Sequence, residues 1–220
     1  MLTNPVQMKK SILVLSIAIA SLSYSCKEVK KDKINDEVTT SSEMTSEKFS
    51  IVNDSTKVSF TAYKTTDKLP VGGTFKSINI TNAKSASTPL EVMKGLKFNI
   101  PISSLFTNDP TGTRDPKITE FFFGVMANPD LISGIFKVDG DKCSIDVTMN
   151  GETANIPLET EINSENKYTF TGVMDLKQWK ATAALASLNK VCDVLHTGPD
   201  GVSKTWDEVA IKGEVTFKQN

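Results

Sequence analysis

The sequence predicts an all-β domain of eight antiparallel strands with one or two short helices, placed behind an N-terminal targeting segment. From Phe49 onward, apolar and polar residues alternate with a period of two, which is the pattern of half-buried antiparallel strands. Turn signals such as Asn150-Gly151 separate successive runs and favour tight hairpins. With 39% hydrophobic and 23% charged residues among 220, the composition is that of a globular domain rather than a disordered chain.

Residues 1–25 are predicted to be a lipoprotein signal peptide. Lys9 and Lys10 precede an apolar run from Ile12 to Leu22, which is shorter than the roughly 20 residues that a membrane-spanning helix needs. The run leads into Leu22-Ser-Tyr-Ser-Cys26, which resembles a bacterial lipobox, so Cys26 is the predicted lipidation site. The alternative is an ordinary secretory signal with an incidental cysteine.

Residues 26–48 are predicted to form a flexible tether between the lipid and the folded domain, which occupies residues 49–220. The segment is rich in Lys, Glu, Asp, Ser and Thr, and it cannot bury enough apolar surface to offset its ordering entropy. Several acyl chains on Cys26 would anchor the protein stably, because each buried methylene contributes about 0.8 kcal/mol. We therefore expect a lipid-anchored protein of the cell envelope, either periplasmic or facing the cell surface.

The eight strands follow from the alternating runs in chain order. They are predicted at residues 58–62, 71–81, 96–103, 132–138, 143–149, 154–158, 168–176 and 209–217. In the second strand the apolar phase shifts between Phe75 and Ile78, which predicts a bulge or bend. Three segments that break the alternation are candidates for the short helices: Pro89–Lys94, Asp115–Phe123 and Leu176–Val191.

The interior of the predicted structure is apolar. Eight antiparallel strands can split into a sandwich or close into a barrel, and a closed barrel of this size is just wide enough for a slender ligand. No charged residue falls on the predicted inward face, where small residues interleave with large ones: Ala62, Gly134, Ala154, Gly172 and Gly213. This pattern suits either a packed core or an apolar bore that stays partly open.

Several short motifs, in order and spacing, resemble the YceI-like family. They are Ile100-Pro-Ile-Ser-Ser-Leu-Phe, Thr113-Arg-Asp, Phe121-Phe-Phe, Asn128-Pro, Gly151-Glu-Thr and Phe170-Thr-Gly-Val-Met-Asp-Leu. The resemblance covers residues 49–218. It implies a secreted, lipocalin-like barrel that binds polyisoprenoid lipids, with a long apolar chain held along the bore. The residues predicted to contact the lipid tail are Phe60, Phe98, Ile100, Phe136, Ile145, Phe170, Met174 and Phe217.

Arg114 is the only arginine in a protein that otherwise uses lysine, so its planar five-donor fork is a distinctive feature. One hypothesis places it at the mouth of the barrel, binding a phosphate or a quinone oxygen. The other pairs it with Asp115, Asp109 or backbone carbonyls and gives it a structural role. Phe121 and Phe122 belong to a run of three Phe residues that one face of a short helix cannot bury, so at least one ring should point into the bore or cover its end. The alternative is that the three rings only pack in the core.

The remaining reactive residues give no catalytic or metal site. Cys143 and Cys192 could form a disulfide outside the cytoplasm, or remain two buried thiols. His196 is the only histidine and lies in a polar loop, where a surface role is expected. No Ser, Cys or Asp has the setting of an activated nucleophile. The formal net charge of −1 gives no basis for a nucleic-acid surface.

The predicted function is non-catalytic binding and transport of an isoprenoid-type lipid, a polyprenyl chain or a quinone, with no cofactor required. The runner-up is a cell-envelope interaction or stress-protection module whose barrel is solidly packed. The predicted partners are the lipid and, through the lipidated N-terminus, the membrane. A homodimer is compatible with the sequence.

Overall fold

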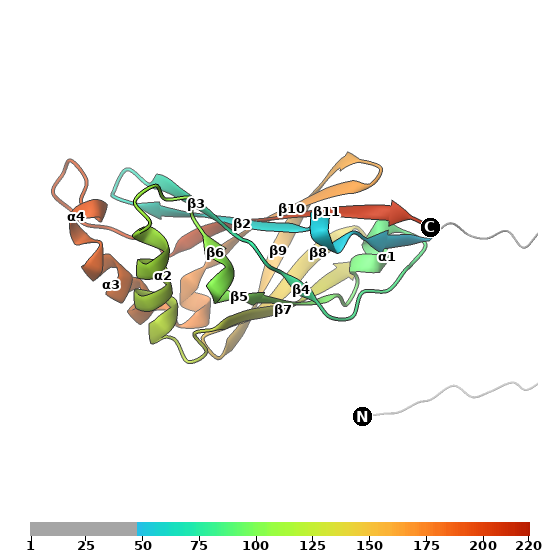
Figure 1. The fold of residues 1–220 in the computed structure, drawn as a ribbon, viewed down its shortest axis with the longest axis horizontal. Helices are drawn as coiled ribbons and strands as arrows, with labels where there is room; N and C mark the ends of the chain where they lie inside the picture. Colours follow the sequence, from blue (N-terminus) through green and yellow to red (C-terminus); the bar gives the residue numbers. More distant parts are fainter. Residues whose placement is uncertain (1–47) are drawn as a thin grey trace, which may run out of the picture. The chain divides into compact units, whose positions relative to one another are not determined.

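The computed structural model describes residues 48–220, which form one antiparallel sheet that curls into a barrel with short helices at its ends (Figure 1). The strands are β1 (Phe49–Ile51), β2 (Lys57–Lys64), β3 (Leu69–Phe75), β4 (Asn79–Ile80), β5 (Lys97–Pro101), β6 (Leu105–Phe106), β7 (Leu131–Asp139), β8 (Lys142–Met149), β9 (Glu152–Ser164), β10 (Lys167–Asp175) and β11 (Glu208–Gln219). The α-helices are α1 (Pro89–Met93), α2 (Arg114–Phe121), α3 (Thr182–Val191) and α4 (Asp193–His196). Single 3-10 turns are η1 (Asn53–Ser55), η2 (Ile102–Ser104), η3 (Phe123–Val125) and η4 (Leu176–Trp179).

The strand order shows how the sheet closes on itself. Neighbouring strands follow the path β4-β5-β7-β8-β9-β10-β11-β2-β3-β6, with β1 added on β11. The two ends of this path meet and close the barrel. The chain runs on from β3 into β4, which pairs with β5, and from β5 into β6, which pairs with β3. The resulting seam has two short ladders, one between β3 and β6 and one between β4 and β5.

The structure confirms the all-β antiparallel barrel, but it has eleven strands where the sequence predicted eight. All eight predicted segments are present. The second is split into β3 and β4 where the phase shift between Phe75 and Ile78 predicted a bulge. The third forms β5 and runs into η2, and β6 lies just beyond its predicted end at residue 103. The eleventh, β1, is only three residues long, too short for alternation to reveal it.

The helices correspond to the three predicted segments plus one more. The segment at Pro89 forms α1, in which Thr88 Oγ1 accepts a hydrogen bond from the backbone N–H of Glu91 and Pro89 occupies the first turn. The second segment forms α2 and η3, and the third forms η4 and α3. The expectation of one or two helices was therefore too low. The extra helix, α4, has only four residues, and one turn leaves no periodic signal in a sequence.

Two clusters of buried side chains fill the two ends of the barrel. The helix-end core lies beneath α2 and α3 and includes Phe122, Phe123 and the fully buried Trp179, whose Nε1–H donates to the Val147 carbonyl at 2.9 Å. The α1-end core includes Tyr168 and Phe217 together with residues of α1. Figure 1 shows α2, α3 and α4 at one end of the barrel and α1 at the other.

The N-terminal predictions fall mostly on residues that the structure does not describe. The predicted signal peptide, residues 1–25, the lipidation site Cys26 and the tether up to residue 47 lie outside the described residues. Lys48, the last residue assigned to the tether, exchanges backbone hydrogen bonds with Asn220 at 3.4 and 2.8 Å. Within residues 48–220, no helix is long and apolar enough to cross a lipid bilayer.

Candidate functional site: an apolar cavity between the two cores

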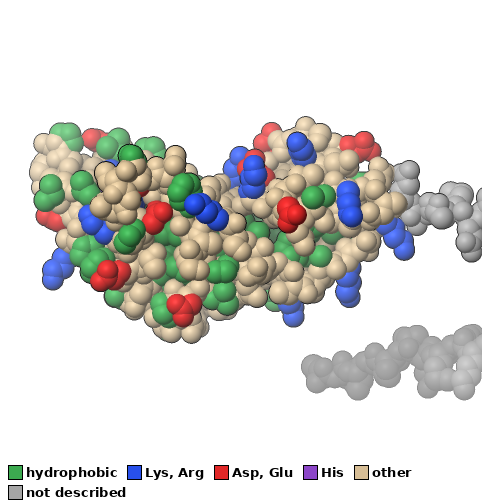
Figure 2. Space-filling model, in the orientation of Figure 1, with side chains coloured by type: hydrophobic (Ala, Val, Ile, Leu, Met, Phe, Trp, Pro, Cys, Tyr) green, Lys and Arg blue, Asp and Glu red, His purple; other side chains and the backbone are tan. Residues whose placement is uncertain are grey.

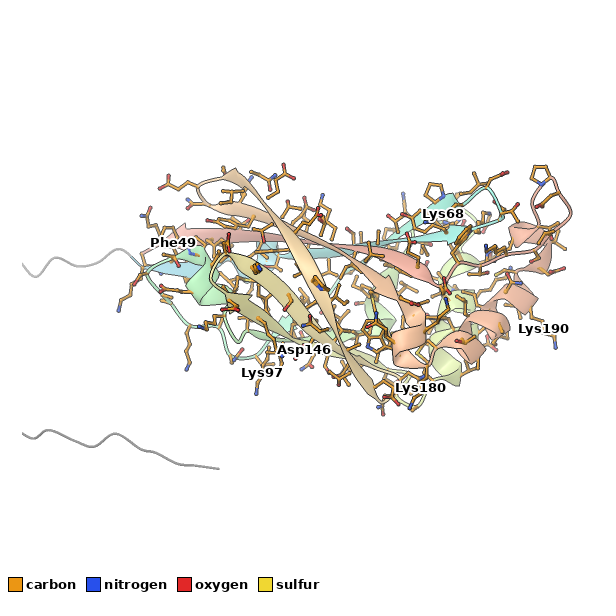
Figure 3. The ribbon with its side chains drawn as sticks, turned by 180° about the vertical axis from the view of Figure 1, so that it is seen from behind. Phe49, Lys68, Lys97, Asp146, Lys180 and Lys190 are labelled. Atoms are coloured by element: carbon orange, nitrogen blue, oxygen red, sulfur yellow. The ribbon has the colours of Figure 1, made fainter. Side chains whose placement is uncertain are left out.

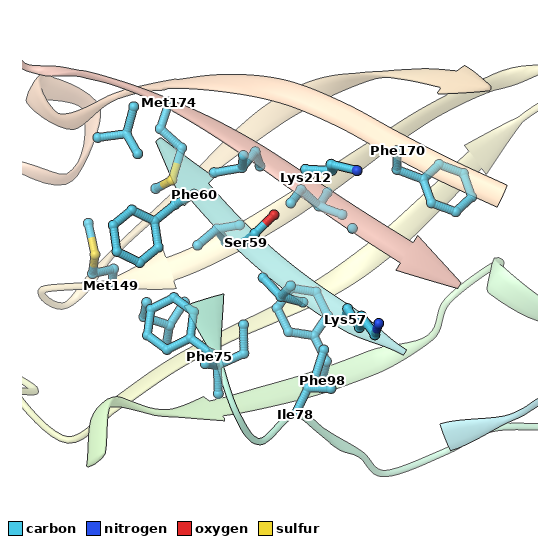
Figure 4. Close-up of a pocket in the computed structure, with 18 of the residues that line it drawn as sticks. Lys57, Ser59, Phe60, Phe75, Ile78, Phe98, Met149, Phe170, Met174 and Lys212 are labelled. Carbon is cyan, nitrogen blue, oxygen red and sulfur yellow. The ribbon is translucent and has the colours of Figure 1, made fainter. Parts of the chain in front are cut away.

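A cavity of about 230 Å³ lies inside the barrel, between the helix-end core and the α1-end core. Its wall is almost wholly aliphatic and aromatic. Figure 4 shows part of the lining, including Phe60, Phe75, Phe98, Met149, Phe170 and Met174. For comparison, an engineered apolar cavity of about 150 Å³ stays dry and binds benzene, whereas drug-sized ligands occupy pockets above about 300 Å³. The cavity therefore suits a slender apolar group.

Two glycines let phenylalanine rings lie flat against the barrel wall. Phe60 pairs with Gly73 across the β2–β3 ladder, and Phe98 pairs with Gly134 across the β5–β7 ladder. A Cβ at position 73 would lie 2.3 Å from the Phe60 ring, and one at position 134 would lie 2.4 Å from the Phe98 ring. Because the rings occupy the space that side chains would fill, they rest on the wall instead of crossing the lumen.

Gly213 leaves a bare stretch of wall in the middle of the lumen. It pairs with Val58 on one side and Phe170 on the other, and all three line the cavity. A Cβ at position 213 would meet no atom within 4 Å. The Phe170 ring instead packs edge-on against Phe136, with their centroids 4.8 Å apart. Nothing from the opposite wall fills the space beside this glycine.

Seven of the eight residues predicted to contact a lipid tail line this cavity: Phe60, Phe98, Ile100, Phe136, Ile145, Phe170 and Met174. Phe217 does not. Only 2% of its surface is exposed, and its ring packs against Tyr168 in the α1-end core, with centroids 5.3 Å apart. It lies on the predicted inward face of β11 but beyond the end of the cavity, where the interior is filled.

Sequence reasoning left several lining residues unnamed. Val209 and Ile211 lie on the inward face that the alternation of the last strand had indicated, so a signal for them existed. Leu185 and Leu188 reach the cavity from α3. No sequence signal identified these two, because the direction in which a helix faces depends on how it packs on the barrel.

Arg114 lies outside the cavity lining, and it serves the structural alternative. Its Nη2 is 3.7 Å from Asp109 Oδ1, while Asp109 Oδ2 accepts the backbone N–H groups of Thr113 and Arg114, both at 3.1 Å. Hydrogen bonds from Thr111 and these N–H groups hold the pKa of Asp109 below its usual range. Arg114 thus helps to secure the loop before α2, as the structural alternative expected, and it is not among the residues that line the cavity.

The three consecutive phenylalanines divide between two roles. Phe122 and Phe123 line the cavity, and their rings meet edge to face with centroids 4.9 Å apart. Phe121, predicted to lie at the mouth, is not part of the lining. The rings of Phe122 and Phe123, together with Ile118 of α2, cover the helix end of the cavity.

Of the two alternatives for Cys143 and Cys192, the structure has the two separate buried thiols and not the disulfide. Cys143 lies on β8 in the α1-end core, whereas Cys192 follows α3 at the other end of the barrel. The strand pattern placed Cys143 on an inward face and put Cys192 after the predicted late helix, but it could not show that the barrel separates the two residues. Burial raises the pKa of the Cys192 thiol, although nearby Lys117 and Lys64 oppose the shift.

His196 is half-buried rather than a free surface group. Its Nδ1 is 2.6 Å from Thr205 Oγ1, which in turn donates to Asn189 Oδ1 at 2.6 Å. Because the single hydroxyl proton goes to Asn189, Nδ1 must carry the proton shared with Thr205. Burial, aided by Lys64, lowers the pKa of His196 to about 4. The neutral imidazole therefore ties α4 to the segment before β11.

Charged side chains gather on the outside of the barrel. Figure 3 shows Lys97, Lys180 and Lys190 directed away from it. Between residues 48 and 220, no group of three or more His, Cys, Asp or Glu side chains is arranged to hold a metal ion.

Comparison with known proteins identifies the fold. The family model described as YceI-like domain matches residues 49–217. A polyisoprenoid-binding domain from Saccharophagus degradans, implicated in plant cell wall breakdown, has the same fold, with a TM-score of 0.55 at 12% identity; the match covers 78% of this chain and 98% of that one. Burkholderia cenocepacia BcnA matches with a TM-score of 0.45 at 17% identity, over 74% of this chain and 96% of its own. No curated protein sequence matches this chain.

Proposed function

The chain belongs to the YceI-like domain family, and we propose that it is a non-catalytic carrier that holds the tail of an isoprenoid-type lipid, a polyprenyl chain or a quinone, in its apolar cavity. The observation that carries this proposal is the hollow lumen. Phe98, Ile145 and Met174 face the interior and yet remain partly accessible, whereas Trp179 in the helix-end core is fully buried. The Saccharophagus degradans domain, described as polyisoprenoid-binding, supports the same class of ligand.

The energetic cost of the cavity favours a carrier over a solidly packed module. At about 24 cal/mol per Å³ of residual cavity, 230 Å³ corresponds to about 5 kcal/mol of lost packing. Domains are stable by only about 5–15 kcal/mol, so a protein that merely needed a stable barrel would gain from filling this space. A bound tail would restore the contacts, at about 25 cal/mol per Å² of buried apolar surface before association costs.

The length of the cavity suits a single extended tail. Four alternate residues of β11, from Val209 to Val215, line it. Six residue steps along a strand span roughly 20 Å. One leaflet of a bilayer provides roughly 15 Å of hydrocarbon depth, half of the full core. A tail that reaches through one leaflet would therefore find a similar length of apolar surface in this barrel.

The N-terminal sequence supports a location for this carrier. A lipid on Cys26 would hold the domain at a membrane of the cell envelope, close to a source of isoprenoid lipid. Cys26→Ala is expected to release the protein from the membrane fraction of the native cells. Retention of that variant would contradict the anchor while leaving lipid binding by the barrel unaffected.

The proposed function can be tested with a variant that plugs the lumen. Gly213→Phe would place a ring in the empty space beside β2, while Gly72→Phe, on the outward face of β3, is the matched control. Each protein is purified from its native envelope and extracted for lipid mass spectrometry. We expect a prenyl lipid or quinone with the wild type and the control, and none with Gly213→Phe. No such lipid in any sample, with no uptake of added quinone, would favour the packed module.

A further inference from the structure

The wall of the barrel has a gap beside β4. The β2–β3 ladder ends at the pair Val58 and Phe75, and β4 pairs only with β5 in the described sheet. Farther along this side, a backbone bridge joins Phe49 and Ala86 through two hydrogen bonds of 2.8 and 3.1 Å. Between these two points no ladder joins β4 to the chain that leads into β2. We call this opening the window.

The window leads into the cavity. Ile51, Thr56 and Lys57 lie on one rim, Ile78 and Ile80 lie on the other, and all five line the cavity. Figure 4 shows Lys57, Ile78 and Phe98 at the same end of the cavity, and Figure 2 shows this face of the molecule hollowed near its middle. At the helix end, side chains of α2, η3 and α3 pack against the lining instead.

Lys57 gives the window an uncompensated positive charge. The residue is exposed, and no described residue forms an ion pair or a side-chain hydrogen bond with its ammonium group. Glu214, its partner across the β2–β11 ladder, instead pairs with Lys212 at 3.0 Å. Lys76 lies beside the window with its Nζ 3.5 Å from the centre of the Phe106 ring, and Asp54 in η1 is the nearby acid. Among the five rim residues named above, Lys57 is the only charged one, and it has no ion-pair partner among the described residues.

We propose that the window is the entrance of the cavity and that the ligand is an amphiphile with a monoanionic head, such as a carboxylate, which stays at Lys57 while the tail enters the lumen. The inference rests on the proposed function and narrows its ligand class. An apolar lumen cannot stabilise a charge, so a charged head must stop at the rim. A lysine there attracts an anion without having to be desolvated, since it remains in contact with water.

The first experiment compares two ligands that share one tail. Geranylgeranoic acid and geranylgeraniol differ only in the carboxylate, and their dissociation constants are measured by calorimetry at pH 7 and low salt. We expect the acid to bind about two- to fivefold more tightly than the alcohol, the range of an exposed ion pair. Lys57→Gln should abolish this preference, and Lys57→Glu should reverse it. Lys142→Gln, which removes an exposed strand lysine on β8 outside the lining, should leave it unchanged.

The second experiment locates the head directly. A carbodiimide activates the carboxylate of the bound acid, which then forms an amide with a neighbouring lysine Nζ; the carbodiimide takes up the oxygen and becomes a urea. Peptide mapping should place the adduct on Lys57. An adduct on Lys117 or Lys64, which lie at the helix end, would overturn the window as the entrance.

The outcomes separate the two proposals. Equal affinity for acid and alcohol in the wild type would overturn the anionic head but leave the carrier function standing. Binding of neither ligand to the wild type, with a folded protein confirmed by circular dichroism, would overturn the carrier function and this inference with it.

Discussion

Phe60 lies directly across the β2–β3 ladder from Gly73, and its ring covers the glycine so closely that a Cβ there would sit 2.3 Å from Phe60 Cζ. The pair explains how a barrel rich in phenylalanine keeps an open lumen, because the ring is held on the wall. The neighbouring Gly72 faces outward, where a Cβ would meet only the Phe60 carbonyl oxygen at 3.9 Å. Two adjacent glycines thus have different roles.

Gly73→Ala is expected to destabilise the protein by about 1–3 kcal/mol, because the added methyl forces the Phe60 ring off the wall. Urea unfolding followed by circular dichroism measures the change. In a Phe60→Leu background the same substitution should cost clearly less, since the obstructing ring is gone. Gly72→Ala is the control and should be nearly neutral. An equal cost at both positions would contradict the packing role of Gly73.

Gly213→Phe should stabilise the ligand-free protein by about 1–2 kcal/mol, because it buries a ring in existing space and removes a strand glycine. The same change should abolish stabilisation by ligand, which for the wild type amounts to about 2.7 kcal/mol at one hundred times the dissociation constant. Thermal melts with and without geranylgeraniol test both expectations. A plugged variant that still gains stability from the ligand would place binding outside the lumen.

His196 should make the domain less stable as the pH falls from about 6.5 to about 4. Its pKa is about 4 in the folded protein and 6.5 when unperturbed, so between these two pH values the unfolded state binds more protons than the folded state. The loss should reach about 1–2 kcal/mol, below the full linkage value because the half-exposed ring is partly screened. His196→Asn, which retains a donor near Nδ1, should flatten this part of the profile. If the free energy of unfolding falls equally with pH in the wild type and in His196→Asn, the loss of stability does not come from His196.

Arg114→Lys should lower the melting temperature only slightly, by about 2 °C, because an exposed ion pair of this length contributes little. Asp109→Ala should have a larger effect, since it leaves the N–H groups of Thr113 and Arg114 without their acceptor. Neither change should alter the affinity for geranylgeranoic acid, because both side chains lie outside the cavity lining. A loss of affinity in Arg114→Lys would return this residue to the ligand site.

Cys143 and Cys192 should be alkylated without any reductant, because they are separate thiols. Iodoacetamide added to the protein in urea is expected to modify both, as peptide mass spectrometry would show. In the folded protein both should react slowly, since both are buried and burial raises the pKa of Cys192. If neither cysteine is alkylated in urea until a reductant is added, the two form a disulfide.

The alternation of apolar and polar residues was sufficient to predict every main wall segment, because each strand chooses its inner face locally. The same local information predicted the break between Phe75 and Ile78, where the inward phase changes. It also placed Phe60, Phe98 and Met174 on the inside, where they line the cavity. Phe217 obeys the same alternation, yet it lies in a filled end of the barrel.

What the sequence by itself determined is which side chains face inward, since that depends on a period of two along each strand. Only the tertiary structure decided where the interior is filled and where it is open, because this depends on which ring meets which glycine across a ladder and on which helices pack over an end. The contact between Arg114 and Asp109 is local, and the sequence had already offered Asp109 as a partner of this arginine. The place of Lys57 beside the gap at β4 could not be predicted, because that gap forms where segments distant in the sequence come together.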